Sequence, residues 1–125
     1  MSQTQNKISV SPQGEAFPLP ELSDYAAEYE RVKALAEAAR ESGKEVVVVM
    51  GVGFVGAVMA AIVADCEGKD GQPSKFVIGC QRPSTRSYWK IPLLNRGVSP
   101  VKAEDPQVDL LIGRCVLEKK TLIAT

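Results

Sequence analysis

The sequence contains no histidine, and only three of its 125 residues are cysteines. The absence of histidine excludes Ser-His-Asp and Cys-His catalysis and zinc sites of the HExxH type. The cysteines, Cys66, Cys80 and Cys115, lie too far apart for a Cys-x-x-Cys zinc or redox motif, and their odd number argues against a disulfide framework. We therefore expect free thiols in the reducing cytoplasm, no metal site and no catalytic cysteine.

The chain also lacks an excess of charge of either sign, because fifteen acidic residues balance fifteen basic ones. Without a positive field, the chain does not attract nucleic-acid phosphates or an anionic membrane surface. Its longest apolar stretches, around residues 46–55 and 57–64, are interrupted by glycine and shorter than the roughly 20 residues that span a bilayer. The N-terminus has neither the basic nor the apolar region of a secretory signal. We expect neither a nucleic-acid nor a membrane partner.

The composition, 45% hydrophobic and 24% charged, is that of one small folded domain. Residues 1–20 are polar and contain three prolines, which predicts a flexible arm. Residues 21–43 predict an amphipathic helix, because apolar residues recur at spacings of three and four along one face. Ser23 or Asp24 can cap its start, and Gly43 can end it in the left-handed conformation.

Residues 44–125 predict an α/β domain: a partial, Rossmann-like parallel sheet of about three strands behind the extra N-terminal helix. Glu45–Met50 holds four consecutive valines, which is typical of a central parallel strand covered on both faces. Ala57–Cys66 predicts a buried helix and Lys75–Cys80 a second strand, which completes a βαβ unit. Asp105-Pro106 predicts the start of a later helix, and a third strand begins near Leu122.

A glycine-rich turn, G-V-G-F-V-G at residues 51–56, joins the first strand directly to the helix. In a G-x-G-x-x-G turn the first glycine permits the tight bend, the second lets a pyrophosphate approach the backbone, and the third lets the helix pack closely. The helix N-terminus adds unpaired N–H groups and a partial positive charge. A tight turn without a ligand is the alternative. The residues predicted to bind a dinucleotide are Gly51, Val52, Gly53, Phe54, Val55 and Gly56.

The second predicted strand ends at Gln81, where the dinucleotide fingerprint has an acidic residue that binds the adenosine ribose. Glutamine can also accept a hydrogen bond from a ribose hydroxyl, but it carries no charge. Arg82 and Arg86 follow, and they would tolerate the 2′-phosphate of NADP. These residues leave the choice between NAD and NADP open, and solvated loop arginines are the alternative interpretation.

The sequence resembles the N-terminal NAD-binding domain of the UDP-glucose/GDP-mannose dehydrogenase family over about residues 44–125. The likeness rests on the Phe-Val pair inside the glycine turn, on Val77–Gln81, on Leu94–Pro100 (L-N-R-G-V-S-P) and on Leu122–Thr125, in the same order. It implies NAD bound by the glycine turn. It also implies that Gln81 stands where the family has its ribose-binding aspartate, and that Arg86 matches a basic residue contacting the adenosine end. The stretch Ser87–Pro92 and everything before Gly43 are additions to the family pattern.

The chemistry of that family is a two-step, NAD-dependent oxidation of a nucleotide-sugar alcohol to a carboxylate. It uses a cysteine nucleophile well downstream, and none of the three cysteines of this chain matches its position. The resemblance implies a fragment, inactive alone, that meets its nucleotide-sugar substrate only together with the missing downstream domains and belongs to a homo-oligomer in the intact enzyme. The alternative is a non-catalytic Rossmann-like nucleotide-binding or regulatory module, with residues 21–43 as an interaction arm.

Overall fold

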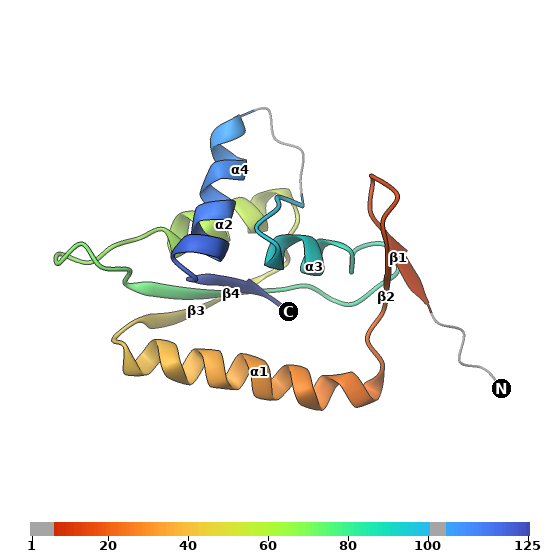
Figure 1. Cartoon of the computed structure of the whole chain (residues 1–125), viewed down its shortest axis with the longest axis horizontal. Helices are drawn as coiled ribbons and strands as arrows, with labels where there is room; N and C mark the ends of the chain where they lie inside the picture. Colours follow the sequence, from red (N-terminus) through yellow and green to blue (C-terminus); the bar gives the residue numbers. More distant parts are fainter. Residues whose placement is uncertain (1–6, 101–104) are drawn as a thin grey trace.

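The computed structural model of the chain describes residues 7–100 and 105–125. It is a mixed α/β fold in which a small parallel sheet lies between helices (Figure 1). The elements, in order, are β1 (Ile8–Val10), β2 (Ala16–Pro18), α1 (Leu22–Glu41), β3 (Glu45–Met50), α2 (Phe54–Ala64), β4 (Lys75–Cys80), α3 (Lys90–Asn95), α4 (Pro106–Gly113), a π-helical turn η1 (Arg114–Glu118) and β5 (Leu122–Ala124).

The sheet has the order β3-β4-β5, and both pairings are parallel. Helices α2 and α4 lie over one face, and α1 lies along the other (Figure 1). On the first face, alanines of α2 pack with Ile112 of α4 against Val77 of β4. On the second, Ala36 and Ala39 of α1 pack against Phe76 and Ile78. The predicted partial Rossmann-like sheet of three parallel strands is confirmed.

The first strand of this sheet is an edge strand, which corrects the prediction of a central strand covered on both sides. In the described chain β3 pairs only with β4, and Val48 is 52% and Met50 81% exposed. The central place belongs to β4, which is buried from Phe76 to Gly79. A run of valines shows that a strand is apolar on both faces, but it does not show whether other elements cover those faces.

Residues 8–18 form an antiparallel β-hairpin, which corrects the prediction of a flexible arm over residues 1–20; residues 1–6 lie outside the described chain. The hairpin is anchored to the start and end of α3. Ser9 is fully buried, and its hydroxyl accepts the N–H of Trp89 at 3.0 Å. The Arg96 guanidinium lies 5.3 Å from the ring centre of Phe17 and also binds the Glu15 carboxylate. These contacts cross about 80 residues, so local polarity could not reveal them.

Helix α1 matches the prediction in extent but not in its cap. Its N-cap is Glu21, whose N–H donates to the Asp24 carboxylate at 2.8 Å, so Asp24 acts from the third helical position instead of capping the helix itself. Gly43 follows the helix in the left-handed conformation, as predicted. The buried face is narrower than the apolar pattern suggests, because Ala36 and Ala39 are buried while Leu22 and Tyr29 are exposed.

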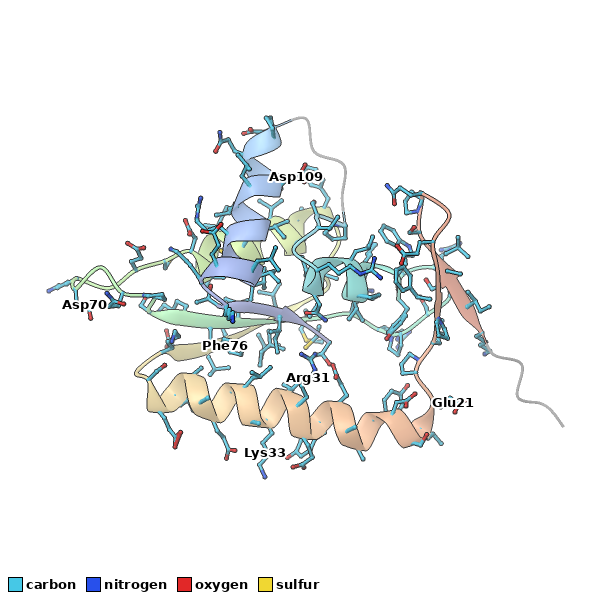
Figure 2. The ribbon with its side chains drawn as sticks, in the orientation of Figure 1. Glu21, Arg31, Lys33, Asp70, Phe76 and Asp109 are labelled. Atoms are coloured by element: carbon cyan, nitrogen blue, oxygen red, sulfur yellow. The ribbon has the colours of Figure 1, made fainter. Side chains whose placement is uncertain are left out.

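Side chains cover the outer edge of β5 at Ala124. The Asn95 amide donates to the carbonyl of Ala124 at 3.0 Å and accepts the N–H of the same residue at 2.8 Å. Arg31 of α1 adds a bond to that carbonyl at 3.1 Å. Figure 2 shows Arg31 beneath the carboxyl end of β5, whereas Lys33 points away from the sheet. The backbone groups of Ala124 that face away from β4 are therefore satisfied.

Candidate functional site

The glycine turn lies at the carboxyl end of β3. Gly51 has a φ of +92°, a conformation that side-chain-bearing residues rarely adopt, and its N–H extends the sheet by donating to Cys80 at 2.6 Å. A Cβ on Gly56 would come 1.8 Å from the carbonyl oxygen of Gly51. Helix α2 therefore begins in direct backbone contact with the turn, which is the close packing predicted for the third glycine.

The second glycine faces open space. The nearest atom to a Cβ built on Gly53 is the Lys90 Nζ, at 4.0 Å. Gly53 is also the N-cap of α2, and no side chain caps that helix. The first N–H groups of a helix have no intrahelical acceptor, and they attract anions. The turn thus combines free N–H donors, a gap without a side chain and a nearby ammonium group, which together suit a phosphate.

Lys90 is a site residue that the sequence interpretation missed. It begins α3, and its ammonium group lies 5.8 Å from the ring centre of Trp89. Within residues 7–100 and 105–125 it makes no ion pair. Residues 81–103 contain no acidic residue although the whole chain is neutral, and this local imbalance was the available signal.

The apolar residues of the turn take different positions. The Val52 side chain is fully buried against Gly79, while its N–H donates to the Gln81 side-chain oxygen at 3.0 Å. Phe54 and Val55 are 61% and 71% exposed at the start of α2. A ligand on this turn would accordingly be held by backbone N–H groups, with Val52 acting through packing.

Gln81 links the glycine turn to the segment before α3. Its side-chain oxygen accepts the N–H of Val52, and its nitrogen donates to the Ser87 hydroxyl at 3.3 Å. The oxygen keeps a second lone pair that can accept a further bond. Arg86 is exposed, and its carbonyl accepts the indole N–H of Trp89 at 2.8 Å. Its guanidinium has no ion pair in the chain as described, so it is available to an anion.

A cavity of about 690 Å³ opens at the carboxyl ends of β4 and β5, with Gln81 and Thr125 in its wall. Tyr25 of α1 and Tyr88 line it, and burial together with the carboxylates of Glu28 and Asp24 raises the pKa of Tyr88. Ligands of α/β sheets bind outside the carboxyl ends of the strands, and this volume is typical of small-molecule sites.

Glu28 closes one side of that cavity. It is bound to Arg31 by two bonds of 2.8 Å, and the Thr125 hydroxyl donates to it at 2.5 Å. The bond from Arg31 lowers the pKa of Glu28, which is therefore a carboxylate at neutral pH.

Two of the three cysteines, Cys80 and Cys115, do not have the surroundings of nucleophiles. Cys115 is fully buried, and burial raises the pKa of both Cys115 and Cys80, which disfavours the reactive thiolate. All three thiols are free. In the described residues no three or more acidic or cysteine side chains gather as a metal site, and no helix there is long and apolar enough to cross a membrane.

Of the comparisons with known proteins, the one with solved structures supports the resemblance to a dehydrogenase. No protein-family profile and no curated protein matches the chain. Among solved structures it is similar to an NDP-N-acetyl-D-galactosaminuronic acid dehydrogenase from Methanosarcina mazei Go1, with 36% identity over 73% of this chain and a TM-score of 0.56. The chain resembles part of a nucleotide-sugar dehydrogenase. It spans 18% of the length of that enzyme.

Proposed function

We propose that the chain is the NAD-binding N-terminal part of a nucleotide-sugar 6-dehydrogenase that oxidises a UDP- or GDP-sugar alcohol to the uronate. The observation that carries this proposal is the open, side-chain-free approach to Gly53 at the uncapped start of α2. The similarity to a dehydrogenase of an NDP-sugar supports a nicotinamide cofactor as the ligand.

In this proposal each group at the carboxyl edge of the sheet has a separate task. The N–H groups at the start of α2 bind the pyrophosphate, and Lys90 neutralises part of its charge. The free lone pair of Gln81 accepts a ribose hydroxyl, and Arg86 contacts the adenosine end. The cavity between α1 and α3 offers apolar and aromatic walls to the adenine. The bound NAD would supply the hydride acceptor.

The chain alone should not turn over substrate. Because none of its three cysteines matches the position of the family's nucleophile, we assign no catalytic residue. Binding of the sugar nucleotide and the chemistry itself would depend on domains that the 125 residues do not supply. We further propose a cytoplasmic location, which suits three free thiols, and a homo-oligomeric intact enzyme.

One observation favours a second candidate, a non-catalytic nucleotide-binding or regulatory module. Gln81 replaces the acidic residue of the fingerprint, and its amide is already bonded to Val52 and Ser87. Such a module would bind a mononucleotide or phosphate on the same turn without selecting the dinucleotide.

Calorimetric titration of the folded chain with NAD, NADP, AMP and inorganic phosphate tests the proposal. We expect NAD to bind, and the variant Gly53→Val to lose that binding because its side chain fills the space of the pyrophosphate. The variant should stay folded, since only Lys90 lies near and a poorer N-cap costs at most about 1 kcal/mol. Unchanged NAD affinity in Gly53→Val would contradict the proposal, and binding of AMP but not NAD would favour the module.

Two further variants make the titration specific. Gly113→Ala is the matched control, because Gly113 is helical and a Cβ there meets its nearest neighbour at an ordinary 3.5 Å; it should bind NAD as the unchanged chain does. Lys90→Ala should weaken the binding of NAD about tenfold, which corresponds to about 1.4 kcal/mol of binding free energy. The NAD affinity of this variant should also depend less on salt concentration.

A further inference from the structure

The groups at the carboxyl edge of the sheet follow the order of its strands. The glycine turn follows β3, Gln81 follows β4, and Thr125 follows β5, so Gln81 lies between the other two. The Gln81 N–H donates to the Thr125 carbonyl at 2.9 Å, and its side chain accepts the Val52 N–H at 3.0 Å. The adenosine half of a dinucleotide has the same order, from pyrophosphate through ribose to base. A pyrophosphate on the glycine turn therefore directs the base towards Thr125.

One face of α1 lines the cavity that opens at Thr125. Asp24, Tyr25, Glu28 and Arg31 all lie in its wall. Asp24 and Glu28 are four positions apart, and Tyr25, Glu28 and Arg31 are three apart, so they share one side of the helix. Arg31 fixes this side to the sheet by donating to the Ala124 carbonyl at 3.1 Å, beneath the end of β5 (Figure 2).

The charged groups of this cavity are mainly hydrogen-bond acceptors. Among the described residues of its wall, Glu21, Asp24 and Glu28 are acidic and Arg31 is basic. Arg31 directs two of its N–H groups to Glu28 and a third to Ala124, which leaves two of the five that a guanidinium carries. A ligand group that enters here is therefore favoured when it donates hydrogen bonds.

Glu28 is held in one orientation and can still accept one more bond. Its Oε1 accepts the Arg31 Nε–H at 2.8 Å, and its Oε2 accepts Arg31 Nη2 at 2.8 Å and the Thr125 hydroxyl at 2.5 Å. A carboxylate has about four acceptor positions, so one remains on Oε1. Burial, followed by the carboxylates of Glu28 and Asp24, raises the pKa of Tyr88 in the same wall. Both carboxylates therefore act on the interior of the cavity.

These acceptors suit adenine better than a purine with a keto group at position 6. The 6-amino group of adenine offers two N–H donors. Hypoxanthine has a keto oxygen there and keeps one N–H on the neighbouring ring nitrogen. A carboxylate repels the keto oxygen, and its hydrogen bonds with an amino group are stronger than those between neutral groups. Tyr25 and Tyr88 offer aromatic surface to either base, so they do not discriminate.

We propose that Glu28 of α1 selects the base of the bound nucleotide, by accepting a hydrogen bond from the 6-amino group of adenine. This inference rests on the proposed function, because it takes the ligand of the glycine turn to be a nucleotide. It makes α1, which lies outside the stretch that resembles the dehydrogenase family, a specificity-determining part of the site. Arg31 and Thr125 act as positioning residues, since they hold the carboxylate of Glu28.

Calorimetric titration with NAD and with nicotinamide hypoxanthine dinucleotide tests the inference. The unchanged chain should bind NAD about tenfold more tightly than the hypoxanthine compound. In Glu28→Gln the amide can accept from an amino group and donate to a keto oxygen, so the two affinities should agree within about twofold. Glu30→Gln is the matched control, because it makes the same change at an exposed position of α1 outside the cavity wall. It should keep the tenfold preference.

The same titrations with AMP and IMP separate this inference from the proposed function. Equal binding of both dinucleotides by the unchanged chain, or a preference that survives in Glu28→Gln, overturns the inference and leaves the proposed function standing. If neither dinucleotide binds but AMP binds more tightly than IMP through Glu28, the dinucleotide proposal fails and the inference stands. A folded chain that binds none of the four overturns both.

A second variant covers the case in which Glu28→Gln does not fold, as judged by circular dichroism. Glu28→Asp keeps the charge but shortens the side chain by one methylene, so its carboxylate no longer reaches the base. It should lose the preference for NAD over the hypoxanthine compound. A Glu28→Asp variant that keeps the preference overturns the inference.

Discussion

The three glycines of the turn have three different physical roles. Gly51 is needed for its positive φ, Gly56 for the space that the Gly51 carbonyl occupies, and Gly53 for neither, since a Cβ there meets only Lys90. The sequence motif correctly predicts the roles of Gly51 and Gly56, which are both roles in backbone geometry. The role of Gly53 remains a prediction, because only a bound ligand would require the absence of a side chain at that position.

Replacing Gly56 should therefore destabilise the fold itself. In Gly56→Ala the added Cβ would lie 1.8 Å from a backbone oxygen, so α2 must shift away from the turn. We expect a loss of about 2 kcal/mol or more in the free energy of unfolding, measured by urea denaturation. Gly113→Ala should lose none. A Gly56→Ala variant as stable as the unchanged chain would mean that the close approach is not real.

Gln81 should control the choice between NAD and NADP. In Gln81→Asp a carboxylate can accept both ribose hydroxyls and repels a 2′-phosphate. We expect the ratio of NAD to NADP affinity to rise about tenfold, corresponding to about 1.4 kcal/mol. The measurement is a pair of calorimetric titrations on each protein. An unchanged ratio would show that the ribose does not lie at Gln81.

At the scale of elements, one carboxylate joins α2 to the turn before β5. Asp65, just after α2, binds the Arg114 guanidinium at 3.0 and 3.1 Å and the Lys119 ammonium at 2.9 Å. Lys119 also contacts Glu67 at 3.1 Å. The bond from Arg114, followed by that from Lys119, lowers the pKa of Asp65 from 3.8 to about 2. This cluster fixes η1 against α2 on the outer face of the domain.

The cluster predicts an acid-sensitive contribution to stability. Because the pKa of Asp65 is lower in the folded chain than in the unfolded one, its contribution is complete above about pH 4 and is lost as the pH falls through about 2. Asp65→Asn should cost about 1 kcal/mol at pH 7, as expected for partly exposed pairs, and little at pH 2. Chemical denaturation at several pH values measures both. Asp109→Asn, on the exposed start of α4 (Figure 2), is the matched control; an equal loss at both pH values would contradict the assignment.

The elements also show which predictions a single sequence supports. The strand–turn–helix at residues 45–64, the second strand and the Asp105 cap, whose carboxylate accepts the N–H of Gln107 at 2.9 Å, follow from local patterns. The hairpin does not, because Ser9 and Phe17 are held by residues of and around α3 that lie far away in the chain. Lys90 was missed for the same reason, since only the fold brings it to Gly53.

For the whole molecule, the sequence predicts the number and direction of the strands better than their order. Four valines on both faces of β3 are equally consistent with a central strand and with an edge strand that another polypeptide covers. The order β3-β4-β5 settles this for the described chain, and it places the glycine turn of residues 51–56 at the sheet edge. The valine pattern itself does not specify what lies beyond that edge.

The two sides of this sheet differ in what they offer an incoming strand. On the far side, Asn95 bonds both the N–H and the C=O of Ala124. A strand that approached the carboxyl end of β5 would have to displace that amide, so this end of the edge resists the edge-to-edge pairing that leads to aggregation.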